Sequence, residues 1–72
     1  MVEVFKTNVN EKHQAEVLVK QIQFLFHHYV ANFDLHDCDK ILRVRSTNGK
    51  VANAEIIQLV NHWGFEAEVL PD

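Results

Sequence analysis

The chain has 72 residues with 47% hydrophobic side chains, a composition typical of a globular protein rather than a disordered one. At this length we expect a single domain over residues 1–72, near the lower size limit for a core without disulfides or metals. Seven Lys and Arg against ten Asp and Glu give a formal net charge of −3, which excludes the clustered basic surface that nucleic-acid binding needs.

Composition also bears on the compartment. No apolar run reaches the roughly 18 residues of a membrane-spanning helix. The first residues lack the positively charged start and the long apolar stretch of a signal peptide. Cys38 is the only cysteine, which excludes an internal disulfide and is typical of a reducing compartment. We therefore expect a cytoplasmic protein that has no contact with a membrane.

The first part of the chain predicts a strand followed by a long helix. Residues 2–7 (VEVFKT) are rich in β-forming residues and too short for a helix. A helix is expected over residues 11–29, with Asn10 as its N-cap. At about 100° per residue its apolar side chains gather into one stripe that faces the core. That stripe consists of Ala15, Leu18, Val19, Ile22, Leu25, Phe26 and Tyr29.

The period then changes to two, which predicts a hairpin. Over residues 30–35 apolar and polar side chains alternate as in a half-buried strand. Residues 36–40 (HDCDK) form a polar turn. Residues 41–46 (ILRVRS) predict the second strand, with Leu42 and Val44 directed inward.

A second helix and a last strand follow a loop over residues 47–53. Asn53 is the expected N-cap of a helix over 54–63, and Gly64 is placed to end it in the left-handed conformation. The inner stripe of this helix consists of Ile56, Leu59, Val60 and Trp63. Residues 65–70 alternate again, which predicts a strand. Its inward side chains are Phe65, Ala67 and Val69.

These elements run in the order β-α-β-β-α-β. Because each strand has one apolar face and each helix one apolar stripe, both helices should cover the same face of a four-stranded antiparallel sheet. Right-handed crossovers then give the strand order 4-1-3-2. The predicted fold class is α+β, a ferredoxin-like βαββαβ sandwich.

Three segments of the chain resemble one known family. They are Tyr29-Val30 with Asn32-Phe33-Asp34-Leu35, then Lys40-Ile41-Leu42-Arg43-Val44, and the segment 56–69 with its Trp63-Gly64-Phe65 turn. They are similar to the second strand, the third strand and the last helix and strand of the heavy-metal-associated (HMA) domains of copper chaperones and metal-transporting ATPases. The resemblance covers almost the whole chain and implies the same ferredoxin-like fold.

The chain departs from that family where the metal would bind. The family holds soft metals with a Cys-x-x-Cys pair between the first strand and the first helix, because thiolates suit Cu(I). The aligned positions here hold Glu11 and Gln14, neither of which is a soft ligand. The resemblance therefore implies an HMA-like domain without the metal motif, in which no residue inherits a ligand role.

Histidines offer a different kind of metal site. The topology places His13, His62 and the hairpin turn at one end of the sheet, so that His13, His62 and Glu11 are candidate ligands for zinc, copper(II) or nickel. The simpler interpretation is that the five histidines are ordinary surface residues. We expect neither a bound metal nor a cofactor. His27 and His28 lie at the opposite end, where a helix C-terminus favours them.

No set of residues predicts catalysis. Cys38 has His36 close in sequence, but a nucleophile needs a setting that stabilises its thiolate, and the flanking aspartates disfavour one. The same pair has no specific metal-ligand spacing. The chain has no paired-carboxylate or triad pattern, and two glycines cannot build a phosphate-binding loop. We therefore do not expect an enzyme.

One candidate contact surface lies on the first helix. Val17 and Phe24 are one heptad apart and lie away from the apolar stripe, with His28 nearby. A lone exposed valine needs no explanation, whereas an exposed phenylalanine is less common. This pattern predicts a contact with a protein partner or a second copy. The alternative is a slightly rotated helix, or a phenylalanine that lies along its own helix.

The open face of the sheet is the second candidate. It is expected to carry Val30, Ile41 and Leu70 together with Asn32, Asp34, Arg43, Arg45, Glu66 and Glu68. Val2 and Val4 join it if Phe5 and Thr7 point inward. The mixed charges either pair across strands or form part of a dimer interface.

These observations predict a small non-catalytic domain that binds a protein partner or forms a homodimer. Two alternatives stay open: a metal carrier with His and carboxylate ligands, and an ACT-like regulatory domain that binds a small ligand and has the same element order. An RNA-recognition sheet is disfavoured, because the chain is acidic and its central strands have no aromatic residue on the open face.

Overall fold

The computed structural model describes residues 1–71, so that Asp72, the last residue of the predicted domain, lies outside the described residues. The elements follow the predicted order. They are β1 (Val2–Thr7), α1 (Lys12–Leu25), β2 (Tyr29–Asp34), β3 (Ile41–Ser46), α2 (Asn53–His62) and β4 (Ala67–Val69).

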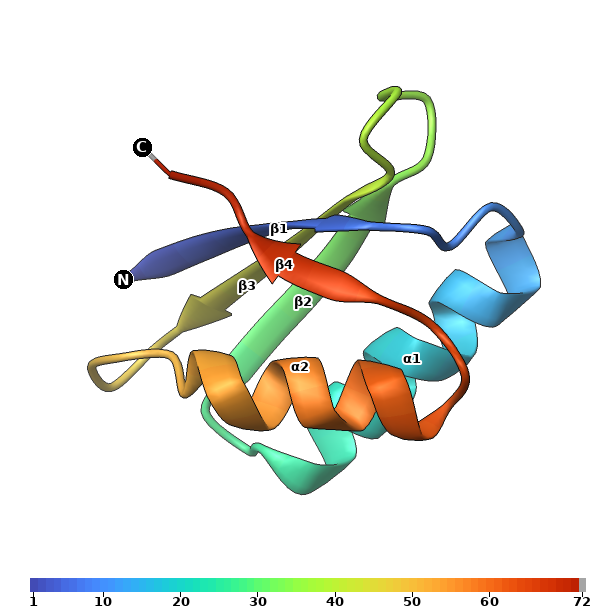
Figure 1. Cartoon of the computed structure of the whole chain (residues 1–72). Helices are drawn as coiled ribbons and strands as arrows, with labels where there is room; N and C mark the ends of the chain where they lie inside the picture. Colours follow the sequence, from blue (N-terminus) through green and yellow to red (C-terminus); the bar gives the residue numbers. More distant parts are fainter. Residues whose placement is uncertain (72) are drawn as a thin grey trace.

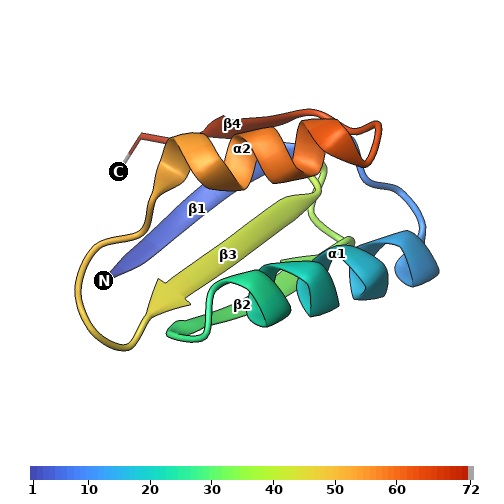
Figure 2. The same cartoon turned by 90° about the horizontal axis from the view of Figure 1, so that it is seen from below.

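The four strands form one antiparallel sheet in the order β2-β3-β1-β4, which is the predicted order read from the other edge. In the centre, Phe5 of β1 is opposite Leu42 of β3 and Val69 of β4. Both helices cover one face, with α1 and α2 side by side (Figures 1 and 2). The predicted α+β, ferredoxin-like architecture is thereby confirmed.

The core fills the space between the sheet and the helices. Its main cluster is fully buried and joins β1, β3 and both helices: Phe5, Ile22, Leu42, Val44, Ile56 and Val60. A smaller cluster of Val9, Ala15 and Leu18 closes the end where β1 passes into α1. The inward side chains predicted for Leu42 and Val44 are therefore confirmed, whereas Val69 on the edge strand is 36% exposed. Most of those predicted for the helices are confirmed as well.

The predicted end of the first helix was wrong. The helix ends at Leu25, and Phe26 is already extended (φ −122°, ψ 91°). Phe26 and Tyr29 still pack against the core, with their rings stacked at a centroid distance of 5.0 Å. They reach it from an extended segment and from the first residue of β2, so the apolar spacing continues after the helix has stopped. Leu25, predicted to be inward, is 54% exposed.

The predicted N-caps were also wrong. Glu11 takes the N-cap position of α1 and Ala52 that of α2, and neither makes a side-chain capping bond. Asn53 has instead entered the helix, where its Oδ1 is buried without a hydrogen-bond partner. The N–H of Ala52 donates to the hydroxyl of Tyr29 at 2.7 Å, which joins the start of α2 to β2.

The C-terminal end of α2 agrees better with prediction. Gly64 is left-handed (φ +90°), and the next N–H, that of Phe65, donates back to the carbonyl of Val60 at 3.1 Å. The last strand is shorter than predicted, Ala67–Val69 rather than 65–70. Trp63, predicted to be inward, is 43% exposed because it lies at the C-cap, beyond the last helical turn.

Candidate functional site

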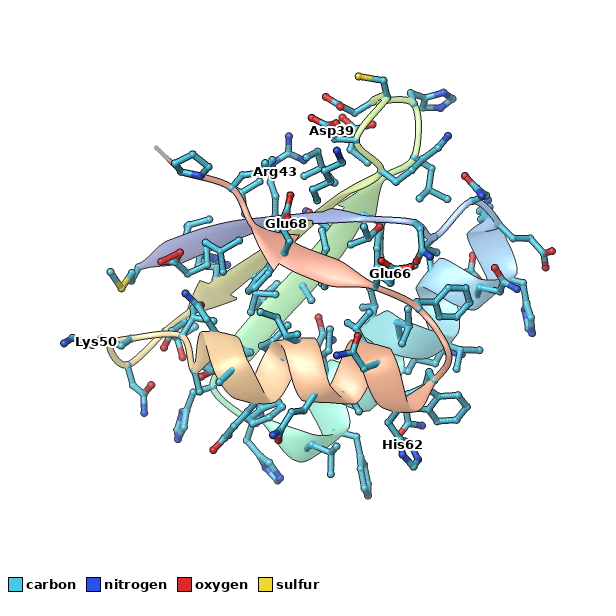
Figure 3. All side chains as sticks on the ribbon, viewed as in Figure 1. Asp39, Arg43, Lys50, His62, Glu66 and Glu68 are labelled. Atoms are coloured by element: carbon cyan, nitrogen blue, oxygen red, sulfur yellow. The ribbon has the colours of Figure 1, made fainter. Side chains whose placement is uncertain are left out.

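The residues predicted to meet at one end of the sheet do not form a common site. Glu11, His13 and His62 are all exposed. Figure 3 shows His62 at the end of α2, far across the view from Asp39 in the β2–β3 turn. Within residues 1–71, one group of His, Cys, Asp or Glu side chains has three ligand atoms within 4.8 Å of one another, and it contains none of the three predicted residues.

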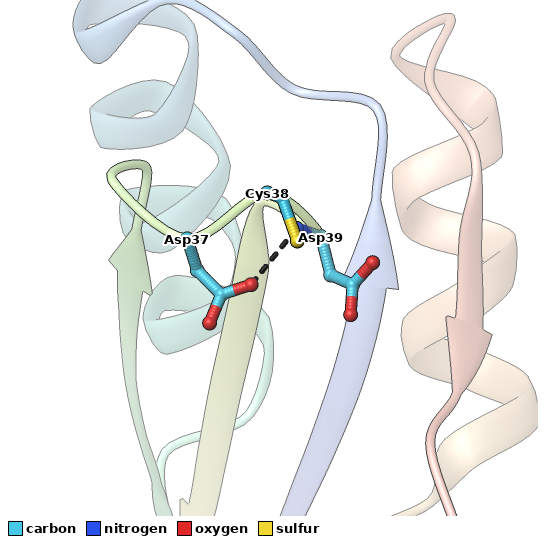
Figure 4. A group of neighbouring side chains, drawn as sticks. All are labelled: Asp37, Cys38 and Asp39. Atoms are coloured by element: carbon cyan, nitrogen blue, oxygen red, sulfur yellow. Dashed lines mark hydrogen bonds between the residues drawn. The ribbon is translucent and has the colours of Figure 1, made fainter.

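That group is Asp37, Cys38 and Asp39 in the β2–β3 turn (Figure 4). Asp37 Oδ1 accepts a hydrogen bond from the N–H of Asp39 at 2.8 Å, and Asp39 lies 3.9 Å from the ammonium of Lys6. Lys40 adopts φ +48°, and its Nζ donates to the carbonyl of Leu35 at 3.1 Å. These contacts explain the carboxylates as parts of the hairpin turn, and Cys38 is exposed beside them.

The exposed side of α1 carries the strongest departure from ordinary surface composition. Phe24 is 74% exposed, so neither the rotated-helix alternative nor burial along its own helix describes it. Its neighbour Leu25 is exposed as well, and neither side chain packs against either core cluster. Val17, one heptad earlier, is half-buried, and His28 is exposed just beyond the helix.

The orientation of α1 follows from its contacts. Ala15, Leu18 and Ile22 are buried against the sheet. Gln23 faces the outer edge of β2, where its Oε1 accepts a hydrogen bond from the N–H of Ala31 at 2.9 Å. Phe24 comes about 100° further round the helix and so points away from both the sheet and that edge. The side chain therefore projects into open space from the helix.

Sequence reasoning missed a groove between α1 and β2. It has a volume of about 890 Å³ and lies open along the edge of the sheet. Its apolar lining comes from Ala15, Val19, Ala31, Phe33 and Leu35, and its charged lining from Lys12, Glu16, Lys20, Asp34 and Arg43. The predicted strand order already made residues 30–35 an edge strand, which was the signal that could have led to it.

On the open face of the sheet, the prediction left undecided for the first strand is now settled. Phe5 and Thr7 are buried on the helix side, so Val2 and Val4 lie on the open face opposite Arg45 and Arg43. Figure 3 shows Arg43 and Glu68 on this side of the sheet. On this face Arg45 lies between Val30 and Val2, and Arg43 lies between Asn32 and Val4. Ile41, which was expected here, is buried.

No protein-family model, curated protein or solved structure matches this chain. None of the helices in the described part is long and apolar enough to cross a membrane.

Proposed function

We propose that this protein is a non-catalytic, HMA-like interaction domain that binds a partner protein through the outer side of α1. Phe24 carries the proposal, because a phenylalanine with 74% exposure on a well-packed helix is a preformed anchor. Leu25, at 54% exposure, extends the apolar surface. Neither side chain belongs to the core clusters of the protein.

The energetics fit a contact residue. Removing a phenylalanine side chain from water contributes about 1.5–3 kcal/mol. Interface energy is concentrated in a few such residues, usually aromatic and surrounded by weaker contacts. Here Val17 and His28 flank Phe24 and would form the weaker rim. An apolar pocket or helix face on the partner is the matching chemistry.

The non-catalytic part of the proposal is supported by the surroundings of Cys38. Cys38 is exposed in a tight turn between two carboxylates that shape that turn. A base that could activate it would have to lie within hydrogen-bond distance. Within residues 1–71, no hydrogen bond joins the thiol to a histidine.

The test compares two variants that introduce the same charge on different helices. Phe24→Asp removes the anchor, and Gln58→Asp places an aspartate at an exposed position of α2. Proteins cross-linked to the wild type in cells are identified, purified and titrated calorimetrically against all three forms. We expect Phe24→Asp to weaken binding of the true partner at least about tenfold, which corresponds to about 1.4 kcal/mol.

Gln58→Asp should leave the affinity unchanged, and both variants should keep the circular dichroism spectrum and melting temperature of the wild type. Equal affinity of Phe24→Asp and the wild type for every identified partner would contradict the proposal.

A further inference from the structure

The outer edge of β2 presents main-chain groups without partners in the sheet. The N–H groups of Tyr29 and Ala31 point away from β3, since they donate to the carbonyl of Phe26 at 3.0 Å and to Gln23 Oε1 at 2.9 Å. Main-chain direction alternates along a strand, so the N–H and C=O of Phe33 point to the same open side. An edge whose main-chain groups have no partner strand is a template for another strand.

The space beside this edge can accept a strand. The α1–β2 groove of about 890 Å³ runs along it, and half-buried Phe33 and Leu35 line its floor. Neither a proline nor a bulge interrupts β2, so two of the devices that protect an edge strand are missing from it. Gln23 covers one N–H group only.

A second copy of β2 fits the pattern of free and occupied groups in one antiparallel register. With Phe33 opposite Phe33 of the second copy, each N–H meets the other C=O. Two residues along, the free N–H of Leu35 meets the free C=O of Ala31. The other two groups of that pair are already used, the N–H of Ala31 by Gln23 and the C=O of Leu35 by Lys40.

The charges agree with the same register. From Ala31 to Phe33 the strand β2 advances by about 6.6 Å. The helix α1, which lies beside it, advances by the same length in about four residues. The two-fold axis therefore passes near Val19, about four residues before Gln23. That axis brings Glu16 of each copy toward Lys20 of the other. Both side chains line the groove rim and are exposed.

The open face of the sheet adds a second complementary pair. In the Phe33-centred register, Asp34 lies opposite Asn32 of the second copy. Asn32 is in turn opposite Arg43 within its own sheet. Asp34 and that arginine are therefore two strands apart, about 9.6 Å, which a long arginine side chain can span. A two-fold axis places the positive side chains of this groove opposite the negative side chains of the second copy.

We propose that this chain forms a two-fold dimer in which β2 pairs with β2 of a second copy across Phe33, joining two four-stranded sheets into one. The dimer uses a different surface from Phe24 and does not depend on the proposed function. Each pair is made twice in such an interface, so each substitution acts twice.

The test is a charge reversal measured by sedimentation velocity over a concentration series. Lys20→Glu should weaken the dimer at least about tenfold, because two attractive pairs become repulsive. Adding Glu16→Lys to it restores opposite charges and should return the dissociation constant to within about threefold of the wild type. Phe24→Asp should leave the dimer unchanged, which separates this proposal from the previous one.

Amide hydrogen exchange locates the interface. Exchange at Phe33 should slow as the protein passes from monomer to dimer. Exchange at Asn32, which is already engaged with β3, should not change. A wild type that stays monomeric at about 1 mM would overturn the proposal. A dimer that the double variant does not restore, that Phe24→Asp abolishes, or that leaves exchange at Phe33 unchanged would overturn it as well.

Discussion

At the scale of single residues, the phenylalanines separate folding from contact. Phe5 is fully buried between the sheet and the helices, and Phe26, Phe33 and Phe65 are half-buried around it. Phe24 alone is exposed. The two side chains are chemically identical. Phe5 is buried because it lies on the inner face of a central strand, whereas Phe24 lies on the outer side of α1.

This difference predicts unequal effects on stability. Phe5→Ala should lower the free energy of unfolding by about 3–5 kcal/mol, because it leaves a cavity in the main cluster. Phe24→Ala should change it by less than about 0.5 kcal/mol. Chemical denaturation followed by circular dichroism measures both. A loss of several kcal/mol for Phe24→Ala would mean that its ring supports the fold after all.

The histidines allow a second prediction at this scale. His13 and His62 are exposed, and neither belongs to the ligand group within the described residues. We expect zinc titrations of His13→Ala, His62→Ala and the wild type to coincide. A stoichiometric zinc site in the wild type that either substitution abolishes would favour the metal-carrier alternative.

At the scale of elements, alternation and crossover handedness predicted the sheet correctly, whereas helix ends were harder to place. The apolar spacing continues from Ile22 through Phe26 to Tyr29, although the helix has already stopped. Periodicity records which side chains reach the core and says little about the backbone that carries them. The two predicted N-caps were each wrong by one residue. No side-chain cap marks the start of either helix.

The contact between β2 and α2 gives a prediction for these elements. The hydroxyl of Tyr29 accepts a hydrogen bond from the N–H of Ala52 at 2.7 Å, at a helix start without a side-chain cap. Tyr29→Phe keeps the ring stacked on Phe26 and removes this acceptor. The free energy of unfolding should fall by about 0.5–1.5 kcal/mol in chemical denaturation. An unchanged value would show that water replaces the hydroxyl at no cost.

The sequence alone predicted one of the two candidate surfaces and missed the other. The position of Phe24 away from the apolar stripe predicted an exposed phenylalanine, and this was confirmed, whereas Val17 is half-buried. The α1–β2 groove was missed, because it depends on where α1 lies over the sheet. Topology placed His13 and His62 at one end of the sheet. That end of the sheet is wider than the coordination shell of a metal ion, so the direction of each side chain decides whether the ligands meet.

At the scale of the whole molecule, the two proposed surfaces lie on different sides of α1. Gln23 faces the β2 edge and Phe24 points away from it. A dimer joined through β2 would therefore leave both copies of Phe24 free to bind partners. The mixed charges of the open sheet face, where Arg43 and Arg45 lie opposite Val4 and Val2, suit solvent better than a large apolar contact.

We propose that this domain acts through protein contacts rather than through a metal, a small ligand or catalysis. Native mass spectrometry of the protein, isolated without tags or chelators, tests it most directly. We expect species at twice the mass of one chain and complexes with other proteins, without metal or small-molecule adducts. A monomer that carries a stoichiometric metal ion or metabolite would contradict it.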